Sequence, residues 1–347
     1  MVRKGFQIKL SDIAKKLNVT TVTVSKALRG HPDISGETIK KVKAVAKELG
    51  YVPNFMARNL SSRHSKTLGV IVPKIAHFFF SMVIESIYDA AFENGYEIIL
   101  TVSQENPERE IEHIQTLLAM RVDGLIISVT ENTIDYTIFD TIRKSGLPIT
   151  FIDRIIPLKE FNTIVTDDYN GAVLATQQAI QCGYKKLGMI GGFQHTNIGR
   201  DRLKGFKDTL KKHHLSIYPE KIVLGGFGEQ EGYKGFMKLY SSGNLPEFIL
   251  AVSFPVALGI YRAAYELGLK IPKDFDIICF GSGTFNQLLT PRLTMVDQPA
   301  SAIGRAAVEL TLENIRNTEY FETKHLKLPT KLVMGDTCVK RNEKSRR

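Results

Sequence analysis

From residue 67 onward the sequence alternates short apolar runs with longer amphipathic stretches, and this rhythm restricts the fold more than any other feature. The runs, rich in Val, Ile and Leu, are residues 68–72, 97–103, 123–128, 148–153, 186–190, 221–225, 247–253 and 274–280. The stretches with apolar residues at helical spacing lie near residues 80–94, 107–120, 134–145, 169–182, 200–213, 229–241 and 255–267. Strands that are apolar almost throughout are typical of parallel sheets covered by helices on both faces. Eight such units in two groups predict an α/β core of two doubly wound subdomains, with a ligand crevice at the carboxyl ends of the strands.

The first fifty residues predict a different, all-α unit made of three short helices. Apolar residues recur three and four apart within residues 10–17, Thr20 is suited to cap a second helix, and Gly30 ends it. A third helix leads to Gly50, where a left-handed residue is favoured. Two helices joined by a tight turn and followed by a third form a helix-turn-helix.

Net charge is concentrated in the same part of the chain. Residues 1–66 contain 14 Lys and Arg against four acids, a net charge of +10, which equals the net charge of the whole 347-residue chain. The remaining 281 residues hold 32 basic and 32 acidic side chains. A basic segment on a neutral body indicates binding to nucleic acid or to an anionic membrane surface.

Other features of the sequence argue against several classes of protein. The N-terminus lacks the apolar segment of a secretory signal, and no apolar run approaches the roughly 18 residues of a membrane span, so we expect a cytoplasmic protein with no membrane partner. The widely spaced Cys182, Cys279 and Cys338 predict neither disulfides nor a zinc site. No phosphate-binding glycine loop or Gly-x-Ser-x-Gly elbow is present, and we expect no cofactor and no metal. A sugar-metabolising enzyme with an α/β core, or a cytoplasmic small-molecule-binding protein, is the alternative to a DNA-binding protein.

A series of short motifs runs through the chain. In the N-terminal part they are Asp12-Ile-Ala, Thr23-Val24-Ser25-Lys26-Ala27-Leu28, Leu49-Gly50-Tyr51-Val52-Pro53-Asn54 and Ala57-Arg58-Asn59-Leu60. Further along they are Phe79-Phe80, Asp123-Gly124, Asp153-Arg154, Arg202-Leu-Lys-Gly205-Phe206 and Gln298-Pro299. In this order, over residues 8 to about 338, the chain resembles the lactose-repressor/galactose-repressor family of bacterial transcription regulators. The resemblance implies a nucleoid-associated homodimer that binds a palindromic double-stranded DNA operator, as a repressor, under the control of a small effector.

The second helix of the N-terminal unit is the expected recognition helix, because its first turns are placed to meet base edges in the major groove. Threonine and valine contact thymine methyl groups, and lysine donates to guanine. We expect base reading by Thr20, Thr21, Val22 and Lys26. The family usually has arginine where Lys26 stands, and lysine lacks the bidentate fork, which predicts a looser guanine preference.

Residues 53–66 are the expected hinge helix and linker. The resemblance implies that Asn54, Ala57, Arg58 and Leu60 lie in the DNA minor groove, with Leu60 as a wedge between base pairs. A segment this short is expected to be helical mainly in the dimer on DNA.

The remaining domain boundaries follow from the same interpretation. The expected parts are the helix-turn-helix at 1–52, a first core subdomain at 67–166 plus 296–325, a second at 167–295 plus 326–339, and a basic tail at 340–347. The tail has no leucine heptads, so we expect a dimer and not a coiled-coil tetramer.

The core is similar to the periplasmic sugar-binding proteins, and the family binds its effector between the two subdomains. The positions that carry over are Phe79, Phe80, Ser128, Asp153, Arg202, Phe227, Ser253, Phe254 and Ser282. Phe79 and Phe80 either stack on a ligand ring or belong to the core. Asp153 and Arg202 either bind ligand hydroxyls and carboxylates or form a structural ion pair.

Two positions depart from the family's pattern. Phe254 stands where the family normally has an acidic residue, and Gly281-Ser282 replaces a pair of aspartates. A polyol pocket uses carboxylates, which accept hydrogen bonds from neighbouring hydroxyls. The expected effector is therefore a sugar or a molecule derived from one. A sugar acid or other derivative held by Arg202, or a more apolar ligand, is favoured over a plain neutral sugar.

Overall fold

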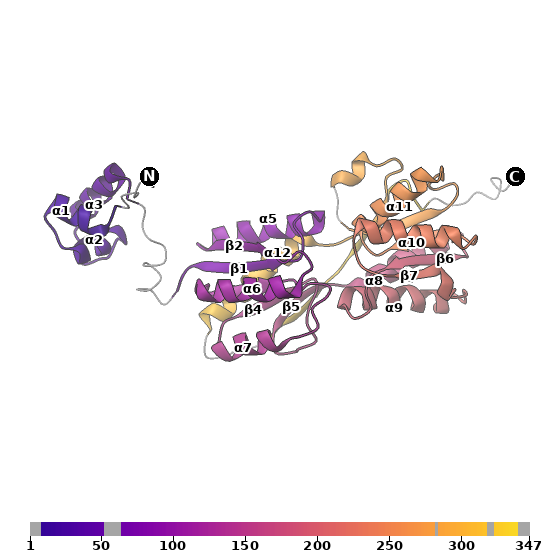
Figure 1. The fold of residues 1–347 in the computed structure, drawn as a ribbon, viewed down its shortest axis with the longest axis horizontal. Helices are drawn as coiled ribbons and strands as arrows, with labels where there is room; N and C mark the ends of the chain where they lie inside the picture. Colours follow the sequence, from indigo (N-terminus) through magenta and orange to yellow (C-terminus); the bar gives the residue numbers. More distant parts are fainter. Residues whose placement is uncertain (1–7, 52–63, 282–283, 318–322, 339–347) are drawn as a thin grey trace, which may run out of the picture. The chain divides into compact units, whose positions relative to one another are not determined.

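The computed structural model describes residues 8–51, 64–281, 284–317 and 323–338. The chain divides into two compact units, residues 1–65 and 66–347 (Figure 1). No helix in the described ranges is both long enough and apolar enough to cross a lipid bilayer.

The N-terminal unit, the headpiece, contains α1 (Leu10–Leu17), α2 (Thr21–Leu28) and α3 (Gly36–Leu49). Their inward faces form a small apolar core that includes Ile13, Val24, Ala27, Val42 and Ala46. Two predicted helix ends are confirmed. The Thr20 hydroxyl accepts a hydrogen bond from the Thr23 backbone N–H at 3.1 Å, and Gly50 adopts φ 67° after α3.

The second unit, the core, contains two six-stranded sheets. The first sheet has the strand order β11-β5-β4-β3-β1-β2, and all its neighbouring strands are parallel. Its strands are β1 (Thr67–Val72), β2 (Glu97–Val102), β3 (Gly124–Ile127), β4 (Ile149–Ile152), β5 (Asn162–Thr166) and β11 (His325–Leu328). Its helices are α5 (Phe78–Glu93), α6 (Pro107–Ala119), α7 (Thr137–Ser145) and α12 (Ala300–Arg316).

The alternation of side chains along β1 explains the layers of this first subdomain. Leu68, Val70 and Val72 pack with α5 and α12 on one face of the sheet, whereas Ile71 packs with α6 and α7 on the other face (Figure 1). Both faces of the strand are therefore buried, which is why residues 68–72 carry no polar side chain.

The second sheet has the strand order β12-β10-β9-β8-β6-β7, with β12 antiparallel to β10 and the other pairs parallel. Its strands are β6 (Leu187–Gly191), β7 (Ile222–Leu224), β8 (Phe248–Ala251), β9 (Asp276–Phe280), β10 (Thr294–Asp297) and β12 (Lys331–Val333). The helices α8 (Asp168–Gln181) and α9 (Asn197–Lys212) cover one face, and α10 (Glu229–Ser241) and α11 (Phe254–Glu266) cover the other (Figure 1).

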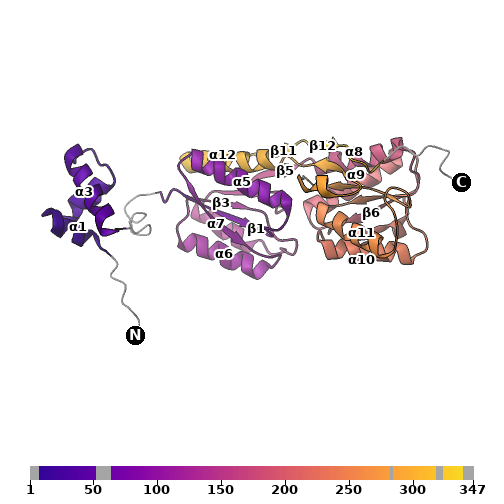
Figure 2. The same ribbon diagram turned by 90° about the horizontal axis from the view of Figure 1, so that it is seen from above.

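The crossings between the subdomains differ from the expected boundaries. The boundary expected at 295/296 falls inside β10, which belongs to the second sheet, and the one at 325/326 falls inside β11, which belongs to the first. The strand–helix rhythm also did not predict β5, β10, β11, β12 or α12. Both β11 and β12 are short edge strands with alternating exposure, so they lack the continuous apolar pattern of buried strands. From another direction, α12, β5 and β11 lie near one another along one side of the first subdomain (Figure 2).

Candidate functional site

The headpiece presents the first turn of α2 to solvent. Thr20, Thr21 and Val22 are exposed, and Val22 retains 62% of its surface although it is apolar. Lys26 lies one turn further along, and its Nζ forms a 3.0 Å ion pair with Asp33 Oδ2. Thr20, Thr21 and Val22 are thus accessible from solvent, and Lys26 is partly exposed and paired with Asp33. The predicted minor-groove residues Asn54, Ala57, Arg58 and Leu60 lie outside the described residues.

A cavity of about 60 Å³ lies in the core, between the carboxyl ends of the two sheets. Its walls are built by residues that follow strands or begin helices, namely His77, Phe78, Phe79, Phe80, Asp153, Arg154, Ile198, Arg202, Phe227, Ser253, Phe254, Pro255, Phe280, Gly281 and Gln298. This position agrees with the crevice that the parallel strands predict. Seven of the nine predicted effector residues line it. Ser128 is fully buried but does not line the cavity, and Ser282 lies outside the described residues.

Arg202 does not pair with Asp153, as one interpretation of the sequence expected. Its Nε and Nη2 bind Asp168 Oδ1 at 2.8 and 2.6 Å, and its Nη1 donates to the Val252 carbonyl. The guanidinium also stacks on Phe280, 3.8 Å from the ring centre. Because Asp168 and Val252 belong to the same subdomain as Arg202, the ion pair braces that subdomain and does not bridge the cleft.

Asp153 follows β4 with a left-handed backbone, φ 58°, which is unusual for a residue with a side chain. Its carboxyl is almost fully buried and makes no hydrogen bond within the described residues. Burial raises the pKa of Asp153 to about 6, although the neighbouring Arg154 opposes the shift. A buried carboxyl at the wall of a cavity, without a partner, is a candidate ligand-binding group.

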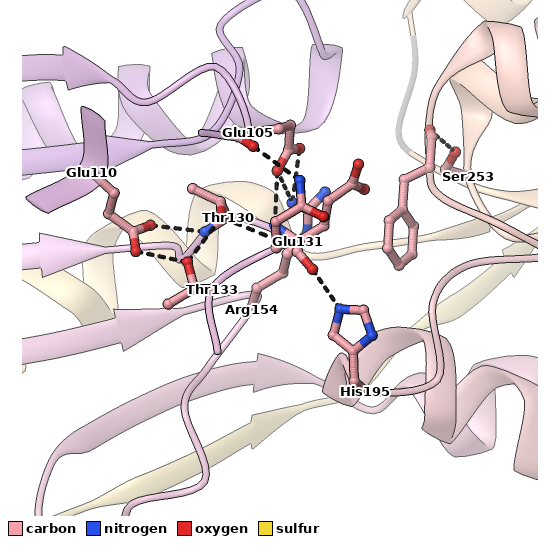
Figure 3. A network of polar contacts seen from close by, with 10 residues as sticks. Glu105, Glu110, Thr130, Glu131, Thr133, Arg154, His195 and Ser253 are labelled. Carbon is pink, nitrogen blue, oxygen red and sulfur yellow. Dashed lines mark hydrogen bonds and ion pairs between the residues drawn. The ribbon is translucent and has the colours of Figure 1, made fainter. Parts of the chain in front are cut away.

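The adjacent Arg154 was part of a recognised motif but was not predicted as a site residue. Its Nη1 binds both carboxylate oxygens of Glu105 at 2.8 Å, and its guanidinium lies 4.8 Å from the ring centre of Phe227. Its Nε is buried and has no hydrogen-bond partner among the residues that the structure describes. Figure 3 shows Glu105 between Arg154 and the Glu131 main chain, whose N–H donates to Glu105 Oε2 at 2.8 Å.

The loop at residues 130–133, next to this ion pair, contacts the second subdomain. The Glu131 carbonyl oxygen lies 2.5 Å from His195 Nε2, which belongs to the second subdomain (Figure 3). Glu110 on α6 holds the same loop in place, because its carboxyl accepts hydrogen bonds from the Thr130 N–H and the Thr133 hydroxyl, each at 2.8 Å. Burial raises the pKa of Glu110 to about 7. His77, at the other wall, has its pKa lowered to about 4 by burial and is neutral at pH 7.

Replacing Glu110 with glutamine is expected to remove a pH-dependent part of the stability. Because folding raises the pKa of Glu110 from 4.5 to about 7, its stabilising contribution is complete below pH 4.5 and is lost as the pH rises through about 7. The free energy of unfolding of the wild type, relative to the variant, should fall by up to about 3 kcal/mol between pH 5 and 8. Urea unfolding at several pH values measures this difference. Glu112→Gln, at an exposed position of α6, is the control and should leave the pH profile unchanged.

Aromatic rings dominate the remaining wall of the cavity. Phe78 begins α5 and Phe254 begins α11, and their rings meet edge to face across the cleft, with centres 5.9 Å apart. Phe80 serves two roles, because it lines the cavity and also packs in the core of the first subdomain. The Ser253 hydroxyl donates to the Phe227 carbonyl at 2.8 Å and caps α11.

Comparison with known proteins agrees with both units. Residues 9–54 match the bacterial regulatory proteins of the lacI family, and residues 176–338 match the periplasmic binding protein-like domain. The HTH-type transcriptional repressor PurR of Klebsiella pneumoniae is 30% identical over 309 residues, which cover 89% of this chain and 90% of that protein. Catabolite control protein A of Staphylococcus epidermidis is 32% identical over 330 residues, covering 95% and 99%. The crystal structure of the Lac repressor dimer bound to operator and the anti-inducer ONPF has the same fold, with a TM-score of 0.83, 24% identity, and coverage of 96% and 99%.

A helix-turn-helix headpiece and a two-sheet core with a cavity between the carboxyl ends define a class of protein that joins DNA binding to ligand binding. The chain belongs to the lacI family of bacterial regulatory proteins, whose members are DNA-binding transcription regulators.

Proposed function

We propose that this protein is a transcription repressor that binds a palindromic operator as a homodimer, and that a small effector in the core cavity weakens or strengthens this binding. The observation that carries the proposal is the presence, in one chain, of a basic helix-turn-helix and of a cavity between two subdomains. The Lac repressor of similar fold is a dimer on its operator, which supports the same arrangement here. We infer that the protein acts by binding alone and is not an enzyme.

The size of the cavity supports a mechanism of control. Pockets for small ligands usually enclose about 300–1,000 Å³, and this cavity encloses about 60 Å³. A sugar-sized molecule therefore enters only if the subdomains separate or the lining rings rotate. A ligand that binds the more open arrangement better shifts the equilibrium toward it by its differential affinity. The contacts between Phe78 and Phe254 and between Glu131 and His195 are the ones that such a movement changes.

The experiment that tests the proposal combines DNA selection with ligand screening of the purified full chain. Sequence selection from random duplexes should return a palindrome, bound by two copies of the chain. A thermal-shift screen against sugars, sugar acids, sugar phosphates and nucleobases should then find a ligand that also changes operator affinity. Binding to DNA without sequence preference, or ligands that stabilise the core without any effect on DNA binding, would contradict the proposal.

For the base readers, we infer that Thr20, Thr21, Val22 and Lys26 contact base edges. Lys26→Ala is expected to relax the preference at one base pair of each half-site by about 1–3 kcal/mol. The matched control is Lys47→Ala, because Lys47 is an exposed headpiece lysine outside α2. It should weaken binding to all sequences alike, as expected for a phosphate contact. Competition binding with single-base operator variants distinguishes the two patterns, and an unchanged preference in Lys26→Ala would exclude its reader role.

A further inference from the structure

A second cavity, larger than the one in the cleft, lies in the first core subdomain. Its volume is about 490 Å³, within the roughly 300–1,000 Å³ of pockets that hold small ligands. Its lining residues belong to the last turns of α7 and α12 and to the segments that begin β4 and β5 or precede β11, so it lies at the amino ends of the strands. Among the described residues, the two cavities have no lining residue in common.

Two asparagine side chains provide polar groups in the buried wall of this second cavity. Asn162 is 2% exposed, and its Oδ1 accepts a hydrogen bond from the Lys324 backbone N–H at 2.8 Å. Its amide NH₂ group donates to no acceptor among the described residues. Asn314 is 7% exposed, and neither end of its amide has a hydrogen-bond partner within the described ranges. Buried amides are seldom left unpaired, so this wall is suited to a ligand that both donates and accepts hydrogen bonds.

The charged lining residues lie on the exposed side of the second cavity. Arg143, Lys159 and Glu160 are all exposed, so two cations and one acid leave this side with a net charge of +1. Arg143 contacts Asp140 only through Nε, at 3.4 Å, and Lys159 forms no ion pair within the part of the chain that the structure describes. The exposed side can therefore bind an anionic group, whereas the buried wall offers uncharged amides.

An aromatic ring completes the buried wall. Phe161 is 4% exposed, lines the cavity, and packs edge to face on Phe151 with ring centres 5.4 Å apart. Both rings belong to the apolar core of the subdomain, so the position of Phe161 is fixed by packing. A fixed aromatic side chain favours a ligand that also has a flat ring.

We propose that this cavity is a second ligand site, and that it binds a nucleoside monophosphate. The base lies against Phe161, and its edge forms hydrogen bonds with the amides of Asn162 and Asn314, because a carboxamide matches the donors and acceptors of a base edge. The phosphate lies on the exposed side, where Arg143 and Lys159 bind it by charge-assisted hydrogen bonds. The proposal goes beyond the repressor function, since the residues of this site belong neither to the cleft cavity nor to the headpiece.

Calorimetric titration of the full-length protein tests the proposal. The probes are the 5′-monophosphates of adenosine, guanosine, cytidine and uridine, the matching nucleosides, ribose 5-phosphate and inorganic phosphate. The best monophosphate is expected to bind at least about 10-fold more tightly than its nucleoside, which lacks the charged group. It should also bind at least about 10-fold more tightly than ribose 5-phosphate or phosphate, which lack the base. No binding by any monophosphate, or equal affinity for the nucleoside or for ribose 5-phosphate, would overturn the proposal.

Variants assign the binding to this cavity. Asn314→Leu keeps the size of the side chain but removes the amide, and it should weaken binding of the best monophosphate at least about 10-fold. Arg143→Gln with Lys159→Gln should reduce the advantage of the monophosphate over its nucleoside to within about 3-fold. The control, Lys211→Gln with Lys212→Gln, removes the same charge from exposed positions of α9 and should leave that advantage intact. Unchanged affinity in Asn314→Leu would place the nucleotide elsewhere, for example in the cleft, and refute the assignment.

Thermal unfolding without ligand separates a binding role of Asn314 from a structural one. Because its amide has no hydrogen-bond partner within the described residues, Asn314→Leu is expected to leave the melting temperature unchanged or to raise it. With the best monophosphate present, the wild type should gain thermal stability and the variant should gain less. A lower melting temperature of the ligand-free variant would mean that the amide is bonded within the protein, which contradicts the proposal.

Discussion

Replacing Arg202 with methionine is expected to lower the free energy of unfolding of the core by about 3–5 kcal/mol. Removal of one partner from a buried ion pair leaves the other charge without compensation, and Asp168 is only 3% exposed. The variant also loses the hydrogen bond to the Val252 carbonyl and the stacking on Phe280. Urea unfolding of the full chain, followed by far-UV circular dichroism, measures the change.

Two further variants distinguish a structural role of Arg202 from a direct role in ligand binding. Arg200→Met is the control on the same helix, since Arg200 is 57% exposed and, within the described part of the chain, forms an ion pair only with its neighbour Asp201, and it should change stability by less than about 0.5 kcal/mol. Adding Asp168→Asn to Arg202→Met should restore part of the lost stability, because the orphaned charge is then removed. If Arg202→Met lowered effector affinity and left stability unchanged, the bracing role would be excluded.

Raising the salt concentration from 50 to 200 mM is expected to weaken operator binding by ~10³–10⁵-fold, on the basis of about 6–10 phosphate contacts. The physical reason is release of counterions from DNA, which contributes less free energy when the bulk salt is higher. The headpiece provides the cations, because its exposed lysines include Lys9, Lys15, Lys16, Lys40, Lys41, Lys43 and Lys47. Fluorescence anisotropy with a labelled operator at several salt concentrations measures the slope.

A pair of double variants assigns that slope to the headpiece. Lys43→Gln with Lys47→Gln should reduce the slope of log affinity against log salt by about 4, because the homodimer then loses two phosphate-neutralising lysines from each of its two headpieces. Lys234→Gln with Lys238→Gln removes the same charge from exposed positions of α10 in the core. This control should leave the slope unchanged, and an equal reduction in both double variants would mean that total charge, not the headpiece, governs binding.

The fold could be predicted from the sequence where an element depends on the pattern of neighbouring residues. Residues 68–72 of β1 carry no polar side chain because both faces of the strand are covered, and the cap at Thr20 depends only on a side chain three residues from the group it binds. The edge strands β11 and β12 could not be predicted in the same way, because half of each is exposed and their pairing is decided by distant partners.

The same distinction applies to the candidate site, of which one part could be predicted from the sequence and another could not. The place of the cavity was predictable, because parallel strands bring their carboxyl ends together, and Asp153, Phe227 and Phe254 were assigned to it through the resemblance to the family. Arg154 was not predicted, because its importance comes from an unpaired Nε that is visible only once Glu105 has taken Nη1.

The sequence by itself determined the basic helix-turn-helix, the two parallel sheets and the place of the cleft, since each depends on periodicity, capping or charge that is read along the chain. Only the tertiary structure decided which partner each charged or bulky group meets. Arg202 binds Asp168 and not Asp153, and the Phe254 ring packs against Phe78 from the other subdomain. The physical reason is that ion pairing and steric exclusion act over a few ångströms between residues far apart in sequence, and several partners are compatible with the same residue pattern.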